Sequence, residues 1–96
     1  MLVDFIVFDS KTETRDIFQI QIEHPLRKDD EVIFSSNLMP EHISKKDYVQ
    51  KVIHKGMIIS VVTKVRHTLK GIGAPIASQR ISYELKLLNH FSNIPI

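Results

Sequence analysis

Residues 57–70, MIISVVTKVRHTLK, are the longest run of β-favouring residues in the chain. Apolar and polar side chains alternate along most of the run, which predicts a half-buried strand with a basic outer face. The inward parity holds Ile59, Val61, Thr63, Val65, His67 and Leu69, and the outward parity holds Ser60, Lys64, Arg66, Thr68 and Lys70. Val62 is the one large apolar residue on the outward parity.

The length of this strand constrains the fold. About thirteen residues at roughly 3.3 Å each span about 43 Å, whereas a compact chain of this size has an expected diameter of about 32 Å. The strand must therefore bend sharply, as strands of small barrels do at bulges, or project from the domain within a two-stranded ribbon. The bend is the commoner solution and is the one expected here.

Three strands are predicted before the long one. Residues 2–9 are apolar on both parities, which indicates a central strand, and the polar residues 10–15 connect it to a second strand at 16–23. The second strand places Phe18, Ile20 and Ile22 inward. After a proline-containing connection, residues 31–35 predict a short third strand.

A last strand is predicted at 80–88, pairing antiparallel with 57–70 because consecutive strands usually lie side by side. Glu84 would then face Lys64 or Arg66 and weaken the basic face. The inward residues of this strand are Ile81, Tyr83, Leu85 and Leu87.

The segment 45–54 is predicted to be a helix. Ser44 followed by Asp47 resembles a capping box, and Gly56 stands where a helix often ends. One helical face would hold Tyr48, Val49, Val52 and Ile53. The alternative is a strand that turns at 55–56 into the long strand, but the lysines and glutamine of this segment favour helix.

These elements predict a mainly β (α+β) fold, either a small antiparallel β-barrel or a curved sheet of about five strands with one short inserted helix. Their order is β-β-β-α-β-β in a single domain, 1–96, with a C-terminal tail at 89–96. The hydrophobic fraction of 43% and the charged fraction of 25% are those of a folded globular chain. The first ten residues, MLVDFIVFDS, resemble neither a signal peptide nor a membrane span, so a cytoplasmic location is expected.

No pattern typical of an enzyme is present, so a non-enzymatic protein without a cofactor is expected. There is no cysteine, and the five histidines have no metal-ligand spacing, so no metal site is predicted. Gly71-x-Gly73 precedes a strand rather than a helix and does not predict a phosphate loop. His67 is expected to be partly buried and bonded to a neighbour.

The charge distribution supplies the main candidate site. Residues 1–48 hold six basic and ten acidic residues, whereas residues 49–96 hold seven basic residues and one acidic residue. A basic surface of this kind suits nucleic acid or an acidic protein, unless the acidic half neutralises it. The candidate binding residues are Lys64, Arg66, Lys70, Arg80 and Lys55. The aromatic side chains are predicted mostly in the core, which leaves few for base stacking.

A second candidate surface is the loop at 71–79, whose Ile72, Pro75 and Ile76 are proposed to dock a partner or to cover the core. The first functional hypothesis is therefore a small protein-binding module, such as an inhibitor, adaptor or immunity-type protein. The alternative is a nucleic-acid-binding small β-barrel that uses the basic strand. Homodimerisation through an edge strand is a further hypothesis, and no membrane association is expected.

Overall fold

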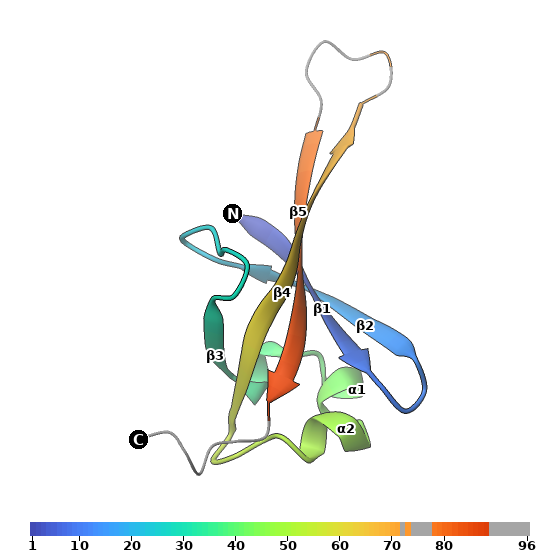
Figure 1. Ribbon diagram of the computed structural model, residues 1–96, viewed down its shortest axis with the longest axis vertical. Coiled ribbons are helices and arrows are strands. Elements are labelled where there is room, and N and C mark those ends of the chain that lie inside the picture. The colour runs from blue at the N-terminus through green and yellow to red at the C-terminus, as the bar shows by residue number, and fades with distance from the viewer. Residues whose placement is uncertain (72, 74–77, 89–96) are drawn as a thin grey trace.

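The computed structural model describes residues 1–71, 73 and 78–88. Within these residues, five strands and three short helical turns follow one another in the order β-β-β-α-β-β, which confirms the mainly β class (Figure 1). The strands are β1 (Leu2–Asp9), β2 (Thr14–Gln21), β3 (Glu31–Ser35), β4 (Met57–Lys70) and β5 (Ser78–Leu88). The helical turns are η1 (Ser36–Leu38), α1 (Glu41–Ser44) and α2 (Asp47–Gln50).

The strands form one mixed sheet in the order β2-β1-β5-β4-β3. β4 and β5 pair antiparallel, as predicted, and β1 lies in the interior of the sheet. The expectation of an antiparallel sheet is wrong at one junction, because β1 and β5 run parallel, with Phe5 opposite Tyr83. β5 runs antiparallel to β4 and pairs with β1 on its other side, so β1 and β5 are neighbours in the sheet.

The sheet is curved but not closed, so the barrel alternative is not supported and the curved sheet describes the fold. The edge strands β2 and β3 do not pair with each other. Nevertheless Phe18 of β2 and Phe34 of β3 lie 6.4 Å apart between ring centroids, and Phe5 contacts both rings. The helical segment contributes Met39, Ile43 and Val49 to this core. It covers the core on the side where the edge strands of a closed barrel would pair.

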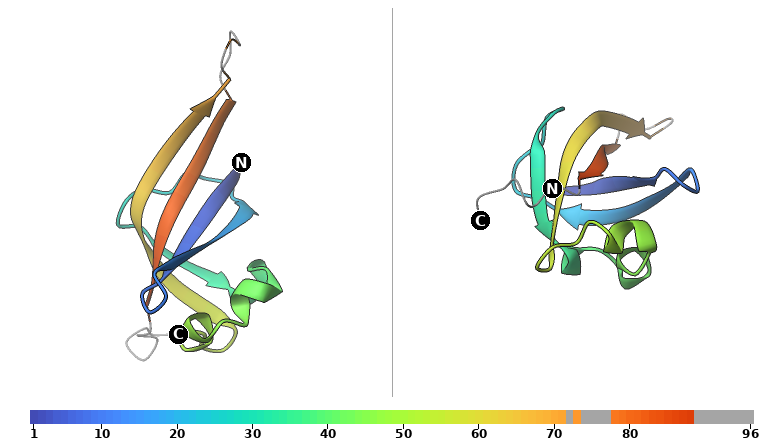
Figure 2. Two further views of the ribbon diagram at one scale, coloured as in Figure 1. Left: turned by 90° about the vertical axis from the view of Figure 1, so that its right-hand side faces the viewer. Right: turned by 60° about the horizontal axis from the view of Figure 1, so that its bottom comes forward.

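The long strand projects from the domain instead of bending back. The radius of gyration is 14.7 Å and the longest dimension 50 Å, whereas a compact chain of this size has a radius of gyration of about 12.5 Å. β3 pairs with β4 only as far as Val61, and β1 pairs with β5 only over residues 82–85. The outer parts of β4 and β5 therefore pair only with each other, as a ribbon at the end of the molecule opposite the helices (Figures 1 and 2).

The predicted facing of the first half of β4 is wrong, because β4 has a β-bulge at Thr63. The pairing with β5 shifts between Val62 and Lys64, so the alternation reverses there. Before the bulge Ile58, Ser60 and Val62 face the core, and Val62 is 0% exposed. After the bulge Val65 packs against the core, as the sequence predicted. Val62 is therefore a core residue and not an outward exception.

The prediction of a single ten-residue helix at 45–54 is wrong in the extent of the helix and in its N-terminal cap. Ser44 ends α1, and its hydroxyl donates to the Glu41 carbonyl at 3.2 Å. Lys46 precedes α2 in an extended conformation, which separates two single turns and lets each place one apolar residue in the core. Residues 48–53 are not a strand either. Lys55 and Gly56 both have positive φ and form a two-residue turn into β4.

The connection from β2 to β3 crosses from one edge of the sheet to the other. The Leu26 amide donates to the Tyr83 hydroxyl at 3.0 Å, and Leu26 packs against the core. Further along, the Asp29 amide donates to the Val62 carbonyl at 2.7 Å, and the Val62 amide donates to the Asp30 carbonyl at 2.9 Å. Backbone contacts and one tyrosine thus hold a connection that has no regular structure.

Candidate functional site

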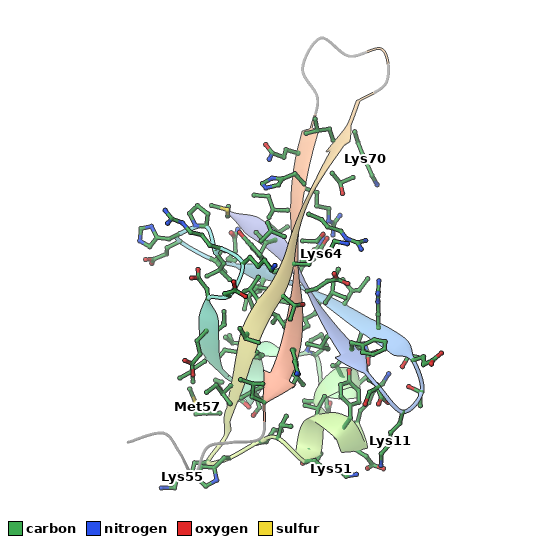
Figure 3. The ribbon with its side chains drawn as sticks, in the orientation of Figure 1. Lys11, Lys51, Lys55, Met57, Lys64 and Lys70 are labelled. Carbon is green, nitrogen blue, oxygen red and sulfur yellow. The ribbon has the colours of Figure 1, made fainter. Side chains whose placement is uncertain are left out.

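The second half of β4, with β5 beside it, carries four of the predicted basic residues, Lys64, Arg66, Lys70 and Arg80. We call residues 64–70 of β4 with residues 78–84 of β5 the basic ribbon. Residues 82–84 also pair with β1, so within the described residues only 67–70 and 78–81 pair with no third strand. Lys64 lies opposite Glu84, Arg66 opposite Ser82, and Arg80 opposite Thr68, so these side chains share one face because directly paired residues point the same way. The sequence from residue 63 to residue 83 contains two lysines, two arginines and no aspartate or glutamate. Lys64 and Lys70 lie at different heights along the ribbon in Figure 3.

Arg80, a predicted binding residue, is held by the body of the protein. Its guanidinium group donates two hydrogen bonds to the carboxylate of Asp4, one of them from Nη2 to Oδ1 at 2.7 Å. The hydrogen bonds to Asp4 raise the pKa of Arg80. The Asp4 carboxylate is buried, so this pair fastens the ribbon to β1 rather than offering a cation to a ligand.

Glu84 neutralises part of the ribbon, as the sequence suggested. Its side chain is 17% exposed and lies 3.9 Å from Arg66 and 3.4 Å from Arg15 of β2. Lys64 stands directly across from Glu84 but forms no ion pair within the described part of the chain. Acidic residues therefore neutralise the basic face only in part. Within the described residues they engage Arg66 and Arg80, while Lys64 is exposed and forms no ion pair with a carboxylate.

The remaining candidate residues do not join this surface. Lys55 lies in the turn that precedes β4, at the far end of the strand from Lys70 (Figure 3). Ile72, Pro75 and Ile76, the proposed docking loop, lie outside the described residues, as does the tail 89–96.

His67 is exposed rather than partly buried, and it is bonded to a neighbour as expected, because its Nδ1 lies 2.9 Å from Gln79 Nε2. Within residues 1–71, 73 and 78–88, no three acidic or histidine side chains are grouped so as to hold a metal ion. In the same residues no helix has the length and apolar character needed to cross a membrane.

A second surface was not predicted from the sequence. β1 and β5 diverge after four paired positions, and a groove of about 1140 Å³ opens between the β1–β2 turn, α2 and the end of β5. We call this the basic groove. Its basic residues are Lys11, Arg15, Lys45, Lys46, Lys51 and Lys86, and its acidic residues are Asp9, Asp47 and Glu84. These residues are scattered along the chain without a local pattern, so no sequence signal groups them.

Comparison with protein-family models, with curated proteins and with solved structures found no match for this chain. The geometry of the ribbon and of the groove therefore carries the functional argument.

Proposed function

We propose that the protein binds nucleic acid through the basic ribbon. The observation that carries this proposal is the basic ribbon, whose outer part pairs with no third strand within the described residues. Its sequence from 63 to 83 has four basic residues and no acidic residue, and Glu84 at its inner end is its one carboxylate. A ribbon of two strands fits the major groove of duplex DNA, which is about 12 Å wide. This favours nucleic-acid binding over the protein-binding hypothesis.

The contacts are expected to be with phosphates rather than with bases. Lys64, Arg66 and Lys70 are exposed on the ribbon, whereas the single aromatic residue between positions 63 and 83 is Tyr83, which is buried. Without an exposed aromatic ring in the described ribbon, base stacking has no platform there. Three phosphate contacts on duplex DNA correspond to a slope of about −2.7 in a plot of log affinity against log salt. We therefore expect binding with little sequence preference and a dissociation constant of about 10⁻⁴ to 10⁻⁶ M.

Fluorescence anisotropy with labelled single- and double-stranded oligonucleotides, at several salt concentrations, tests the proposal. The variant Lys64→Glu/Arg66→Glu reverses two ribbon charges and should weaken binding by about hundredfold while keeping the fold. The matched control Arg27→Glu/Lys28→Glu reverses two exposed charges in the β2–β3 connection. Its affinity for the oligonucleotides should stay close to that of the original protein. Equal affinities of the two variants, or an affinity that does not change with salt, would contradict the proposal.

Protein binding is the second candidate, and a specific surface favours it. β2 is an edge strand of eight residues whose Ile17 is 57% exposed, and Phe8 on the neighbouring β1 is 48% exposed. An open edge beside apolar side chains suits pairing with a strand of a second copy. Sedimentation velocity over a range of concentrations should then detect a dimer that Ile17→Asp abolishes. A monomer at every concentration would exclude this arrangement. The cytoplasmic location expected from the sequence stays a prediction under either function.

A further inference from the structure

Lys11, which lines the basic groove, lies on a hydrogen-bonded turn between β1 and β2. The Asp9 carboxylate accepts a hydrogen bond from the Lys11 amide at 3.0 Å and another from the Thr12 hydroxyl at 2.8 Å. The hydrogen bond from Thr12 contributes most to the lowered pKa of Asp9. A side chain that bonds the backbone two residues further on fixes a turn of this kind. The direction in which Lys11 leaves the β1–β2 hairpin is therefore set by its own turn.

The other wall of the groove is tied to the same hairpin through Asp16 of β2. Its carboxylate accepts hydrogen bonds from the Lys46 ammonium at 2.7 Å and from the Tyr48 hydroxyl at 2.5 Å. Lys46 immediately precedes α2, and Val49 within α2 is buried in the core. Because α2 is held at both points, Lys51 at its C-terminal end faces the β1–β2 turn.

Lys11 and Lys51 consequently meet at the groove (Figure 3). The close approach of the Lys11 ammonium lowers the pKa of Lys51, because two positive donor groups in contact repel each other, and this outweighs the opposing effect of Asp47 and Asp9. Neither lysine forms an ion pair with a carboxylate of the described residues, and the same holds for Lys86. Two like charges held together cost stability, and such arrangements are concentrated at binding sites.

We propose that the basic groove binds a phosphorylated small molecule, with the phosphate group between Lys11 and Lys51. A phosphate monoester carries a charge of about −1.5 to −2 at neutral pH, which matches two converging ammonium groups better than a carboxylate does. The volume of about 1140 Å³ is ample for a ligand larger than the phosphate itself. Phe8, Val52 and Leu87 line the groove and supply an apolar surface for the rest of the molecule.

The test is an NMR titration of the full chain with three probes: inorganic phosphate, adenosine monophosphate and adenosine. We expect saturable shifts of the Lys11 and Lys51 side-chain signals with both phosphate probes, and a dissociation constant for adenosine monophosphate at least about tenfold below that for phosphate. Adenosine should leave these two signals unchanged. Absence of saturation by both phosphate probes, or equal binding of adenosine and its monophosphate, would overturn the proposal.

Variants separate this site from the ribbon. Lys11→Gln and Lys51→Gln should each weaken phosphate binding by about tenfold, because each removes one charged hydrogen-bond donor. The melting temperature should not fall, since repulsion is relieved. Lys28→Gln, a lysine outside the groove, serves as the control. The ribbon variant Lys64→Glu/Arg66→Glu should retain the groove shifts, so the two sites can fail independently. Equal phosphate affinity in Lys11→Gln, Lys51→Gln and Lys28→Gln would refute the assignment.

Discussion

Replacing Tyr83 with phenylalanine tests how the unstructured connection between β2 and β3 is held. Tyr83 is 1% exposed, and its hydroxyl accepts a hydrogen bond from the Leu26 amide at 3.0 Å. Tyr83→Phe keeps the ring and its edge contact with Phe5 at 6.1 Å, but leaves the Leu26 amide without its acceptor. An unsatisfied, partly buried amide costs about 1–2 kcal/mol. At about 4–8 °C per kcal/mol for a domain of this size, the melting temperature should fall by about 5–15 °C.

Urea denaturation followed by circular dichroism measures this loss, and hydrogen exchange measures where it occurs. The Leu26 amide should exchange faster in Tyr83→Phe, with an unchanged denaturant slope. Tyr48→Phe is the control, because it also removes one hydroxyl, but one that bonds Asp16 rather than the connection. A Tyr83→Phe protein within about 0.3 kcal/mol of the original, with Leu26 still protected, would refute the role assigned to Tyr83.

Three further outcomes are expected. Glu84→Gln frees Arg66 from its carboxylate partner, so nucleic-acid affinity should rise and the salt slope should steepen by about 0.9 in anisotropy; an unchanged slope would show that Glu84 does not limit binding. Burial alone would raise the pKa of Asp16, but hydrogen bonds from Lys46 and Tyr48 outweigh it and hold the pKa below its usual value. The ionised Asp16 carboxylate therefore stabilises the fold at neutral pH, and this contribution is lost on acidification below about pH 4. Asp16→Asn should flatten the acid limb of a plot of stability against pH; an identical acid limb would contradict this. Gly56 has a φ of 75°, and a Cβ added there would meet no atom within 4 Å. Gly56→Ala should therefore cost about 1 kcal/mol from backbone strain alone, and Gly56→Asn less, by thermal denaturation; equal costs would point to another cause.

The positions of the strands followed from the sequence. β1, β3 and β4 have the predicted bounds, and β2 and β5 differ from prediction by only two residues at their ends. Phe18 and Tyr83 are buried, as their parity predicted. The alternation of apolar and polar residues along a strand indicates which of its faces is buried, and this can be interpreted without knowing the neighbouring strands.

The helical segment shows where local signals mislead. Ser44 and Asp47 have the spacing of a capping box, yet Ser44 ends one turn and Lys46 begins the next. Core packing decides the outcome, because Ile43 and Val49 must both be buried from a segment that also has to lead into the turn before β4. Helix signals worth a fraction of a kcal/mol per residue are weaker than the burial of two large aliphatic side chains.

By itself the sequence determined the mainly β class, the order of the elements and the basic character of β4, all of which depend on residues close together in the chain. Only the tertiary structure decided that β1 and β5 run parallel, that a bulge turns Val62 inward, and that Asp4 engages Arg80. It also decided that Lys11 and Lys51 meet in one groove. The physical reason is that strand register and the approach of distant side chains depend on how the whole core packs, and no pattern within a short stretch of residues records that packing.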